Sequence, residues 1–402
     1  MVAVFVTIAT GWVAFALPYP IFSHVFLEPE HGLVSAEMPQ ARRTLLLGTA
    51  IALYPLGQIL GSPLLGRWSD RYGRKRVLQL SLWGAVFGSG ILASGVALGS
   101  IPVLLLGRFL SGLAEGSLSI AQSIASDVST PATKARNFAA IGIAVDLGFI
   151  VGPLIGGVLA DDDLVPWFSV ELPFWVATGM FVLNALALPF LLREPTITRS
   201  PTVVAPRALR STLLDARLAP TFVVSFLTFW TITVFFDFFA LYFVQVFRAS
   251  PAAIGVYAAL ISGPLIASGL CVNRVVQRWG ARNTALASVV LMSTGLTWFV
   301  VPEELWGLVL PIIVICIGIN FAQTTTSLLI SDLAPGDEQG QALGVYRSIT
   351  VLAAGLSAFI GGVLAGLSPA YPFYTGIITA LTAGVVLLVR PGSASVTDQL
   401  RV

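Results

Sequence analysis

Twelve apolar stretches, each close to the length of a membrane span, dominate this 402-residue sequence. An α-helix needs about 20 mostly apolar residues to cross the hydrocarbon core of a bilayer. Only 10% of the residues are charged, against about 25% in soluble domains. We therefore predict an all-α integral membrane protein with twelve transmembrane helices. The predicted helices lie near residues 2–27, 44–66, 77–99, 101–127, 137–160, 170–192, 218–246, 252–272, 284–301, 305–332, 343–366 and 370–390.

A short basic loop joins the second and third predicted helices. It holds five Lys and Arg between residues 67 and 76. Lys and Arg in short loops resist translocation, so this side is predicted to be cytoplasmic. Most other basic residues fall on the same side, and acids collect on the opposite side. Both termini are then cytoplasmic. Met1 begins directly in an apolar run without a basic segment before it, so no secretory signal is expected.

An internal repeat divides the chain into two halves. Ser126-Asp127 recurs as Ser331-Asp332, and the pentamer at 156–160 recurs at 361–365, both displaced by 205 positions. Between the halves, segment 193–217 carries three prolines among Ser, Thr and Arg, which is typical of a linker. The predicted units are an N-terminal six-helix bundle, a cytoplasmic linker and a C-terminal six-helix bundle, at 1–192, 193–217 and 218–402.

The basic loop matches the pattern G-x-x-x-D-R-x-G-R-K, and this run resembles the signature loop of the major facilitator superfamily. The resemblance implies the fold of that superfamily, two six-helix pseudo-repeat bundles, and a transporter rather than an enzyme. It also implies a cytoplasmic charge relay that holds one conformation closed against the start of helix 11, around Gly344. The residues carried over to this relay are Gly66, Asp70, Arg71, Gly73, Arg74 and Asp127.

Helix 5 carries small residues at intervals of four, together with an internal proline. Such spacing lets another helix approach closely, and the proline bends the helix. Helix packing alone explains such a pattern in many proteins. The whole run is, however, similar to the antiporter motif of twelve-helix drug/proton antiporters, where it is proposed to shape the central cavity and limit leakage. The motif residues here are Gly148, Gly152, Pro153, Gly156 and Gly157.

Helix 4 contains two charged residues, Arg108 and Glu115, in a run that resembles the helix-4 motif of the family. They are seven residues apart, so they share a helix face at a separation of about 10 Å along the axis. Ser119 and Gln122 extend that stripe. An ionised group in hydrocarbon is costly unless it faces water or a partner. A structural ion network is one interpretation, and we favour a face that lines a cavity.

Three acids inside predicted helices are candidates for proton coupling, namely Glu115, Asp146 and Asp237. A carboxyl group in a low-dielectric cavity can load and release a proton as access alternates. The helices expected to line the cavity, by the resemblance, are helices 1, 4, 7 and 10. The predicted substrate-binding residues on them are Tyr19, Arg108, Glu115, Ser119, Gln122, Trp230, Asn320, Gln323 and Thr324.

The predicted function is proton-coupled efflux, by antiport and alternating access, of small organic compounds or drugs across the inner (plasma) membrane. The chain has no G-x-x-x-x-G-K-[ST] run for ATP, so an ion gradient supplies the energy. One alternative is proton-coupled uptake of a metabolite, sugar or siderophore, and another is a non-transporting membrane sensor. The expected partners are a small-molecule substrate, protons and the lipid bilayer. No cofactor, metal or nucleic acid is expected, and the transporter is expected to be a monomer.

The first half also resembles tetracycline exporters around residues 63–74. That subfamily places acids in helices 1, 3 and 9, and those predicted helices hold no Asp or Glu here. Metal-chelated tetracycline is therefore not expected as the substrate.

The predicted orientation is testable by thiol labelling. With Cys271 and Cys316 replaced by serine, a cysteine at Lys75 should react with a membrane-impermeant maleimide from the cytoplasmic side only, because the basic loop stays inside. A cysteine at Asp162, in a predicted external loop, should show the opposite pattern. Labelling of position 75 from the exterior would contradict the orientation.

Overall fold

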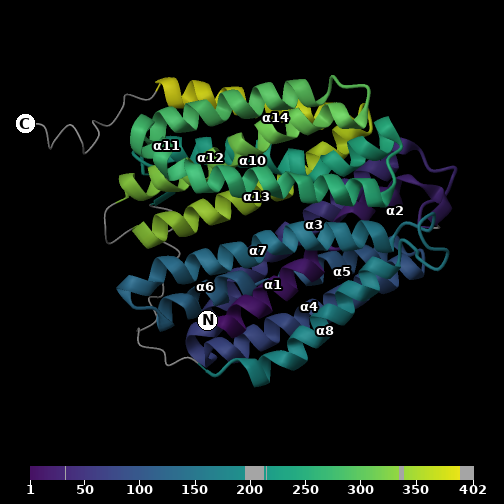
Figure 1. Cartoon of the computed structure of the whole chain (residues 1–402), viewed down its shortest axis with the longest axis horizontal. Helices are drawn as coiled ribbons and strands as arrows, with labels where there is room; N and C mark the ends of the chain where they lie inside the picture. The colour runs from purple at the N-terminus through teal and green to yellow at the C-terminus, as the bar shows by residue number, and fades with distance from the viewer. Residues whose placement is uncertain (32, 195–211, 214, 335–338, 390–402) are drawn as a thin grey trace, which may run out of the picture.

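The chain folds into two helical bundles that lie side by side (Figure 1). The computed structural model describes all residues except 32, 195–211, 214, 335–338 and 390–402, and the described part contains helices and no strands. Most of the predicted linker 193–217 lies outside the described residues, so its boundaries stay a prediction.

The helices of the first bundle are α1 (Val2–Ala16), α2 (Phe22–Leu27), α3 (Gln40–Tyr72), α4 (Arg74–Ala97), α5 (Ile101–Leu113), α6 (Ser117–Val128), α7 (Pro131–Leu159) and α8 (Leu172–Leu191), with the 3-10 turns η1 (Tyr19–Ile21) and η2 (Pro29–His31). Those of the second bundle are α10 (Ala219–Tyr242), α11 (Pro251–Phe299), α12 (Val309–Leu333), α13 (Gln339–Ala365) and α14 (Tyr371–Val389), with the π-helical turn η3 (Phe243–Phe247) and the 3-10 turn η4 (Leu305–Leu308).

Eleven described helical segments are long and apolar enough to cross a membrane. One of them, α11, has 49 residues and is interrupted at Gly280, where φ is 79°. This left-handed conformation favours glycine, and it separates two spans that match the predicted helices at 252–272 and 284–301. The twelve-span fold is therefore confirmed.

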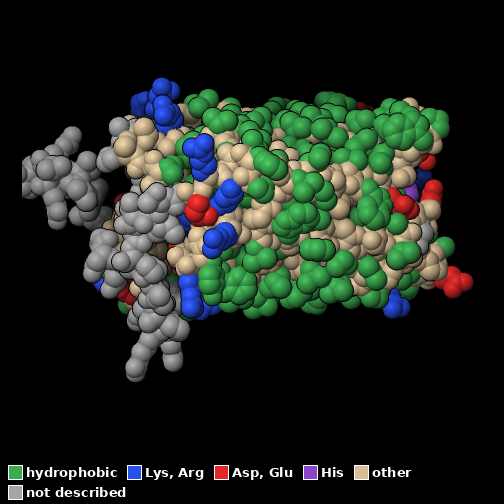
Figure 2. Space-filling model, turned by 90° about the horizontal axis from the view of Figure 1, so that it is seen from below, with side chains coloured by type: hydrophobic (Ala, Val, Ile, Leu, Met, Phe, Trp, Pro, Cys, Tyr) green, Lys and Arg blue, Asp and Glu red, His purple; other side chains and the backbone are tan. Residues whose placement is uncertain are grey.

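The outer surface carries an apolar belt between two charged ends (Figure 2). Large apolar side chains such as Phe190, 90% exposed, and Phe87, 67% exposed, form part of it. Such exposure is unfavourable in water and is expected where a protein faces lipid. We call the end with the 67–76 loop the basic end, and the end with Glu30 and Asp162 the acidic end.

The two bundles touch through glycines near the acidic end. Helix α3 packs on α13, and a Cβ added to Gly48 would lie 2.6 Å from the Cα of Gly362. Helix α7 packs on α11, and a Cβ on Gly157 would lie 3.1 Å from the Cα of Gly255. These positions tolerate no side chain, because the helix backbones themselves are in contact.

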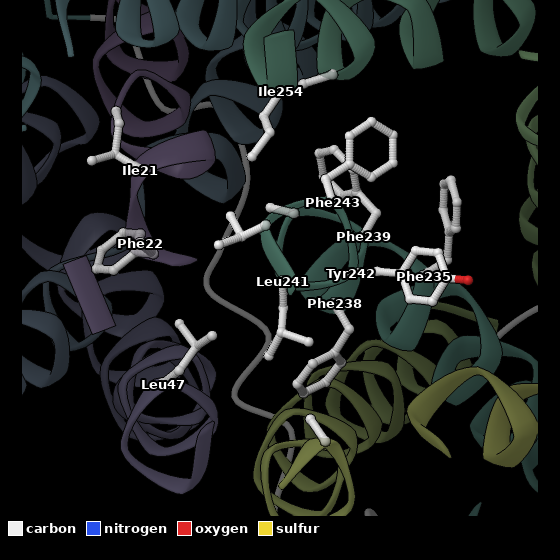
Figure 3. Close-up of a cluster of buried hydrophobic side chains, with 14 of the residues drawn as sticks. Ile21, Phe22, Leu47, Phe235, Phe238, Phe239, Leu241, Tyr242, Phe243 and Ile254 are labelled. Carbon is white, nitrogen blue, oxygen red and sulfur yellow. The ribbon is translucent and has the colours of Figure 1, made fainter. Parts of the chain in front are cut away.

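Beside these contacts, a cluster of buried apolar side chains closes the acidic end (Figure 3). We call this cluster the aromatic plug. Its labelled members are Ile21, Phe22 and Leu47 of the first bundle and Phe235, Phe238, Phe239, Leu241, Tyr242, Phe243 and Ile254 of the second. A cross-bundle hydrogen bond accompanies it, in which His24 Nε2 lies 3.0 Å from the carbonyl oxygen of Ala249.

Toward the basic end the facing surfaces are not packed in this way. Among the described residues, no neighbouring atom lies within 4 Å of a Cβ added to Gly142 of α7 or Gly344 of α13. Asp146 and Arg347, farther along the same two helices, are exposed. The structure is thus closed at the acidic end and accessible from the basic end.

Filling the glycine contact should loosen the closed end. Gly48→Val places a branched side chain against the backbone of Ala358 and Gly362, so we expect a cysteine at Ile254 in the plug to react at least fivefold faster with a maleimide, measured in a background without native cysteines. Gly142→Val, the same change in open space, serves as the control. Equal labelling rates in both variants would show that this contact does not keep the plug shut.

Candidate functional site

The fourth membrane span is broken at Glu115. Helix α5 ends at Leu113, α6 begins at Ser117, and Gly116 between them has φ −137° and ψ −4°. The predicted span over 101–127 is present as Ile101–Val128, but its helix is interrupted at this point. Irregular backbone at membrane depth occurs where it is buried in protein or lines a water-filled cavity.

Two serines from neighbouring helices satisfy the backbone groups that the break leaves free. Ser81 of α4 donates to the carbonyl of Ala114 at 2.6 Å and accepts from the N–H of Gly116 at 3.3 Å. Ser62 of α3 donates to the carbonyl of Glu115 at 2.9 Å. An unpaired backbone group would cost several kcal/mol in the membrane, so these bonds allow the helix to break.

The side chain of Glu115 is fixed at the start of α6. Its Oε2 accepts from the hydroxyl of Tyr54 at 3.1 Å, and its Oε1 accepts from Ser117 at 3.0 Å. A helix N-terminus is a favourable place for a carboxylate. Ser119 and Gln122 are exposed on α6 beyond the break. The predicted continuous stripe from Arg108 to Gln122 is thus interrupted, and neither residue lines the cavity described below.

Arg108 lies where the two bundles meet, beside the aromatic plug. Its Nε donates to the carbonyl of Ala50 at 3.0 Å, and its guanidinium lies 4.8 Å from the ring centroid of Phe22 and 5.1 Å from that of Tyr54. Cation–π contacts of a desolvated guanidinium contribute about 2 kcal/mol or more. The group therefore sits in a site built to hold its charge.

Across the bundle interface, Arg108 faces Asp237 of α10. No direct ion pair joins them among the described residues, but the two charges lie near enough to influence each other, and the Asp237 carboxyl also lies near the hydroxyl of Tyr19. Tyr19 itself donates to the carbonyl of Phe236 at 2.5 Å. The sequence predicted Tyr19, Arg108 and Asp237 as separate candidates, and the structure brings them together between the bundles.

A cavity inside the first bundle runs beside Arg108 and Glu115. Its polar wall comprises Thr7, Ser81, Ser89, Arg108, Ser111, Glu115 and Ser117, and its aromatic wall comprises Trp12, Phe15, Phe22, Tyr54, Phe174 and Phe181. Its volume is about 50 Å³, whereas one water molecule needs about 10–15 Å³ by the same measure. The cavity is wide enough for water and too small for a drug-sized molecule.

Of the predicted substrate residues in the second bundle, two hold helices of that bundle together. Trp230 is 9% exposed and donates from Nε1 to Thr375 of α14 at 3.2 Å. Asn320 donates to the carbonyl of Leu265 in α11 at 3.0 Å. Gln323 is exposed and Thr324 half-buried on α12. The role of these four residues in substrate binding stays a prediction.

A group of aromatic side chains that the sequence did not reveal lies beside α1. Trp12 contacts Phe15 and Phe149 at ring-centroid distances of 5.3 Å, and Phe15 contacts Tyr54 at 4.9 Å. The four rings are half-buried. The spacing of Trp12 and Phe15, one helical turn apart, was the available signal.

The predicted antiporter motif faces two helices at once. Gly148, Gly152 and Gly156 pack on α1, whereas Pro153 and Gly157 pack on α11 of the other bundle. Asp146 lies two helical turns before Pro153 and hence on the α11-facing side of α7. Asp146 itself is exposed, whereas Gly157 farther along α7 is packed.

The predicted charge relay is assembled around Arg74. Its Nη1 lies 2.5 Å from Asp70 Oδ1, and its Nε donates to Asp127 Oδ2 at 3.0 Å. Arg71 instead lies over the ring of Tyr72, and Gly73 adopts φ 104° at the turn between α3 and α4. The predicted contact with helix 11 is not seen in this conformation: a Cβ added to Gly344 would meet no atom within 4 Å among the described residues.

Solved structures share this architecture. The human organic anion transporter MFSD10 (TETRAN) is similar, with a TM-score of 0.70 and 21% identity over 96% of this chain and 98% of that one. A D-xylose–proton symporter is similar with a TM-score of 0.71 and 16% identity over 95% and 96% of the two chains. At these identities the likeness shows the fold.

Sequence relatives add the family. The chain is 26% identical over 320 residues to the class B tetracycline resistance protein of Escherichia coli, covering 75% of each, and 27% identical over 372 residues to multidrug resistance protein 1 of Bacillus subtilis, covering 89% of this chain and 91% of that protein. The sequence pattern of the family described as "Major Facilitator Superfamily" matches this chain twice, over residues 1–327 and over residues 221–399. Together the two matches span nearly the whole sequence, and the chain belongs to the major facilitator superfamily.

Proposed function

We propose that this transporter exports small, moderately apolar organic compounds in exchange for protons. The observation that carries the proposal is the placement of Arg108 and Asp237 at the bundle interface beside the plug, where the hydrogen bond from Tyr19 to the carbonyl of Phe236 crosses from one bundle to the other. A titratable group at this place links the protonation state of the protein to the separation of its two halves. Relatives described as multidrug and tetracycline resistance proteins support the direction of transport.

The orientation follows from the basic end. Short loops rich in Lys and Arg remain in the cytoplasm, so the end with the 67–76 loop is proposed to face inward and both termini to be cytoplasmic. The conformation then has its plug closed toward the exterior and its bundle interface accessible from the cytoplasm. In an exporter this is the state that takes up substrate.

The Arg108–Asp237 interaction is proposed to lock the empty carrier. While Asp237 is ionised, its attraction to Arg108 holds α10 against the first bundle beside the plug. A substrate that inserts between these groups, or a proton that neutralises Asp237, removes the lock. Either event alone allows the bundles to move, so the carrier crosses with substrate in one direction and with a proton in the other. The empty, ionised carrier stays locked and does not leak.

Glu115 and Asp146 remain further candidates for carrying protons. Glu115 is held by Tyr54, and Tyr54 also touches the group of aromatic side chains beside α1, so a substrate on those rings would act on the Glu115 contacts. Asp146 is exposed at the bundle interface, where protons reach it from the open side. Both side chains lie within membrane spans. Glu115 lies at the break between α5 and α6, and Asp146 lies on α7, which packs on α11 of the second bundle.

The proposed substrate is an organic compound without a bound metal. The half-buried rings of Trp12, Phe15, Phe149 and Tyr54 offer an apolar, flat surface near two charged groups. Such walls suit aromatic molecules with few polar groups. No Asp or Glu occurs in α1, α2, α4 or residues 281–299, so nothing there would hold a metal chelate.

Proton coupling is testable in proteoliposomes that carry the purified protein. Asp237→Asn and Glu115→Gln should each lower transport of ethidium driven by a pH gradient at least tenfold, because the neutral side chain no longer exchanges a proton. Substrate counterflow without a gradient should remain within threefold of wild type. Asp162→Asn, at the acidic end, serves as the matched control.

Two outcomes would contradict the proposal. One is undiminished gradient-driven transport when Glu115, Asp146 and Asp237 are all neutralised. The other is a rise of substrate inside intact cells when the gradient is present and a fall when it is collapsed, which is the behaviour of the uptake alternative.

The charge relay gives a second test. Asp70→Ala and Asp127→Ala should each leave membrane insertion unchanged and reduce transport severalfold, because each removes one of the two carboxylates that hold Arg74. The double variant should be little worse than either single variant, since both act through Arg74. Wild-type flux in Asp70→Ala would exclude the relay role.

A further inference from the structure

The cavity inside the first bundle contains polar atoms that the protein does not satisfy. The hydroxyls of Thr7 and Ser111 are buried, and neither has a hydrogen-bond partner. Both residues line the cavity, on α1 and α5, together with Arg108 and Glu115. A buried hydroxyl without a partner is unfavourable, and such groups in native proteins are usually paired with ordered water.

The size and lining of the cavity fit a small group of water molecules. Its volume of about 50 Å³ corresponds to roughly four waters. A buried water needs two to four polar partners. Four residues that line the cavity supply these partners: Thr7 and Ser111 with their unpaired hydroxyls, Glu115 with its carboxylate and Arg108 with its guanidinium.

In the second bundle, the positions equivalent to Arg108, Ser111 and Glu115 hold no charged or hydroxyl side chain. The 205-residue offset of the repeat pairs Arg108 with Ile313, Ser111 with Cys316 and Glu115 with Asn320. Cys316 is fully buried among apolar side chains, and α12 is unbroken from Val309 to Leu333. Among the described residues, the helix break and the charged pair beside it are therefore specific to this helix of the first bundle and are not a by-product of the repeated fold.

We propose that this cavity is a hydration site that exchanges the proton of Glu115 from within the first bundle, with Thr7 and Ser111 as positioning residues for the water. This inference rests on the proposed proton coupling and deepens it. The protonated carboxyl of Glu115 gives its proton to a cavity water, and the resulting carboxylate keeps the bonds from Tyr54 and Ser117. Return of a proton from the water restores the acid.

The arrangement separates the proton from the organic substrate. Trp12, Phe15 and Tyr54 belong to the aromatic wall of the cavity, and the first two also contact Phe149 of α7. A substrate on these rings stays outside a space that admits only a few waters. Of these three rings, Tyr54 is the one that bonds to Glu115, so it connects the two compartments.

The first experiment measures hydration and needs no transport substrate. In purified protein, the infrared carboxyl band of protonated Glu115, assigned by its loss in Glu115→Gln, should shift within the dead time on transfer to heavy water. Thr7→Val combined with Ser111→Ala should slow this exchange at least tenfold. Ser94→Ala, the same change on α4 outside the cavity, should exchange at the wild-type rate. Unchanged exchange in the double variant overturns the proposal.

The second experiment measures coupling with ethidium in proteoliposomes. The double variant should lose at least fivefold in transport driven by a pH gradient and keep counterflow within twofold of wild type. Ser111→Thr, which retains a hydroxyl, should recover most of the coupled rate. An equal loss of counterflow would show that the hydroxyls serve folding or substrate binding, and would overturn the positioning role. Absence of ethidium movement by the wild-type protein would instead count against the proposed function, while the infrared result still decides the hydration site.

Discussion

A guanidinium group buried at the junction of two bundles constrains the rest of this structure. Arg108 cannot sit in hydrocarbon without partners, and the chain surrounds it with a carbonyl, two aromatic faces and an acid from the opposite bundle. These partners come from α2, α3 and α10, so the position of this one charge depends on the mutual placement of the three helices. Movement of the bundles must therefore change its environment. That dependence makes it the natural point at which a proton and a substrate act on the same equilibrium.

The two ends of the bundle interface are closed by different forces. At the acidic end, backbone contacts between glycines and an apolar plug exclude water, and salt or charge has little effect on such packing. At the basic end, an ion-pair cluster around Arg74 is assembled but has no partner in the second bundle among the described residues. The side chains of Arg74 and Asp127 are 11% and 5% exposed, so this pair is shielded from water, whereas Asp70 is 39% exposed. An alternating carrier must open one end while the other is closed, and here the apolar end is closed and the charged end is not.

Sequence reasoning predicted the spans, the two bundles and the Asp70–Arg74–Asp127 cluster, because hydropathy, repeats and a specific motif each encode one of these directly. It missed the break at Glu115, since Ser81 and Ser62, which stabilise the break, lie on other helices and carry no local signal. It also did not reveal that Trp230 bonds to Thr375 of α14. In a helix that is apolar on every side, periodicity does not tell which face meets a cavity and which meets a neighbouring helix.

The break in the fourth span links these observations. In a continuous helix, no helix N-terminus would lie beside the carboxyl of Glu115. The interruption instead places the carboxyl at the start of α6 and against Tyr54, and it widens the interior of the first bundle beside Ser111. The repeat shows that this was not required by the fold, because the equivalent helix in the second bundle is unbroken and holds Asn320 at the matching position. The two halves share an architecture, and the proposed proton site at Glu115 lies where the first half departs from it.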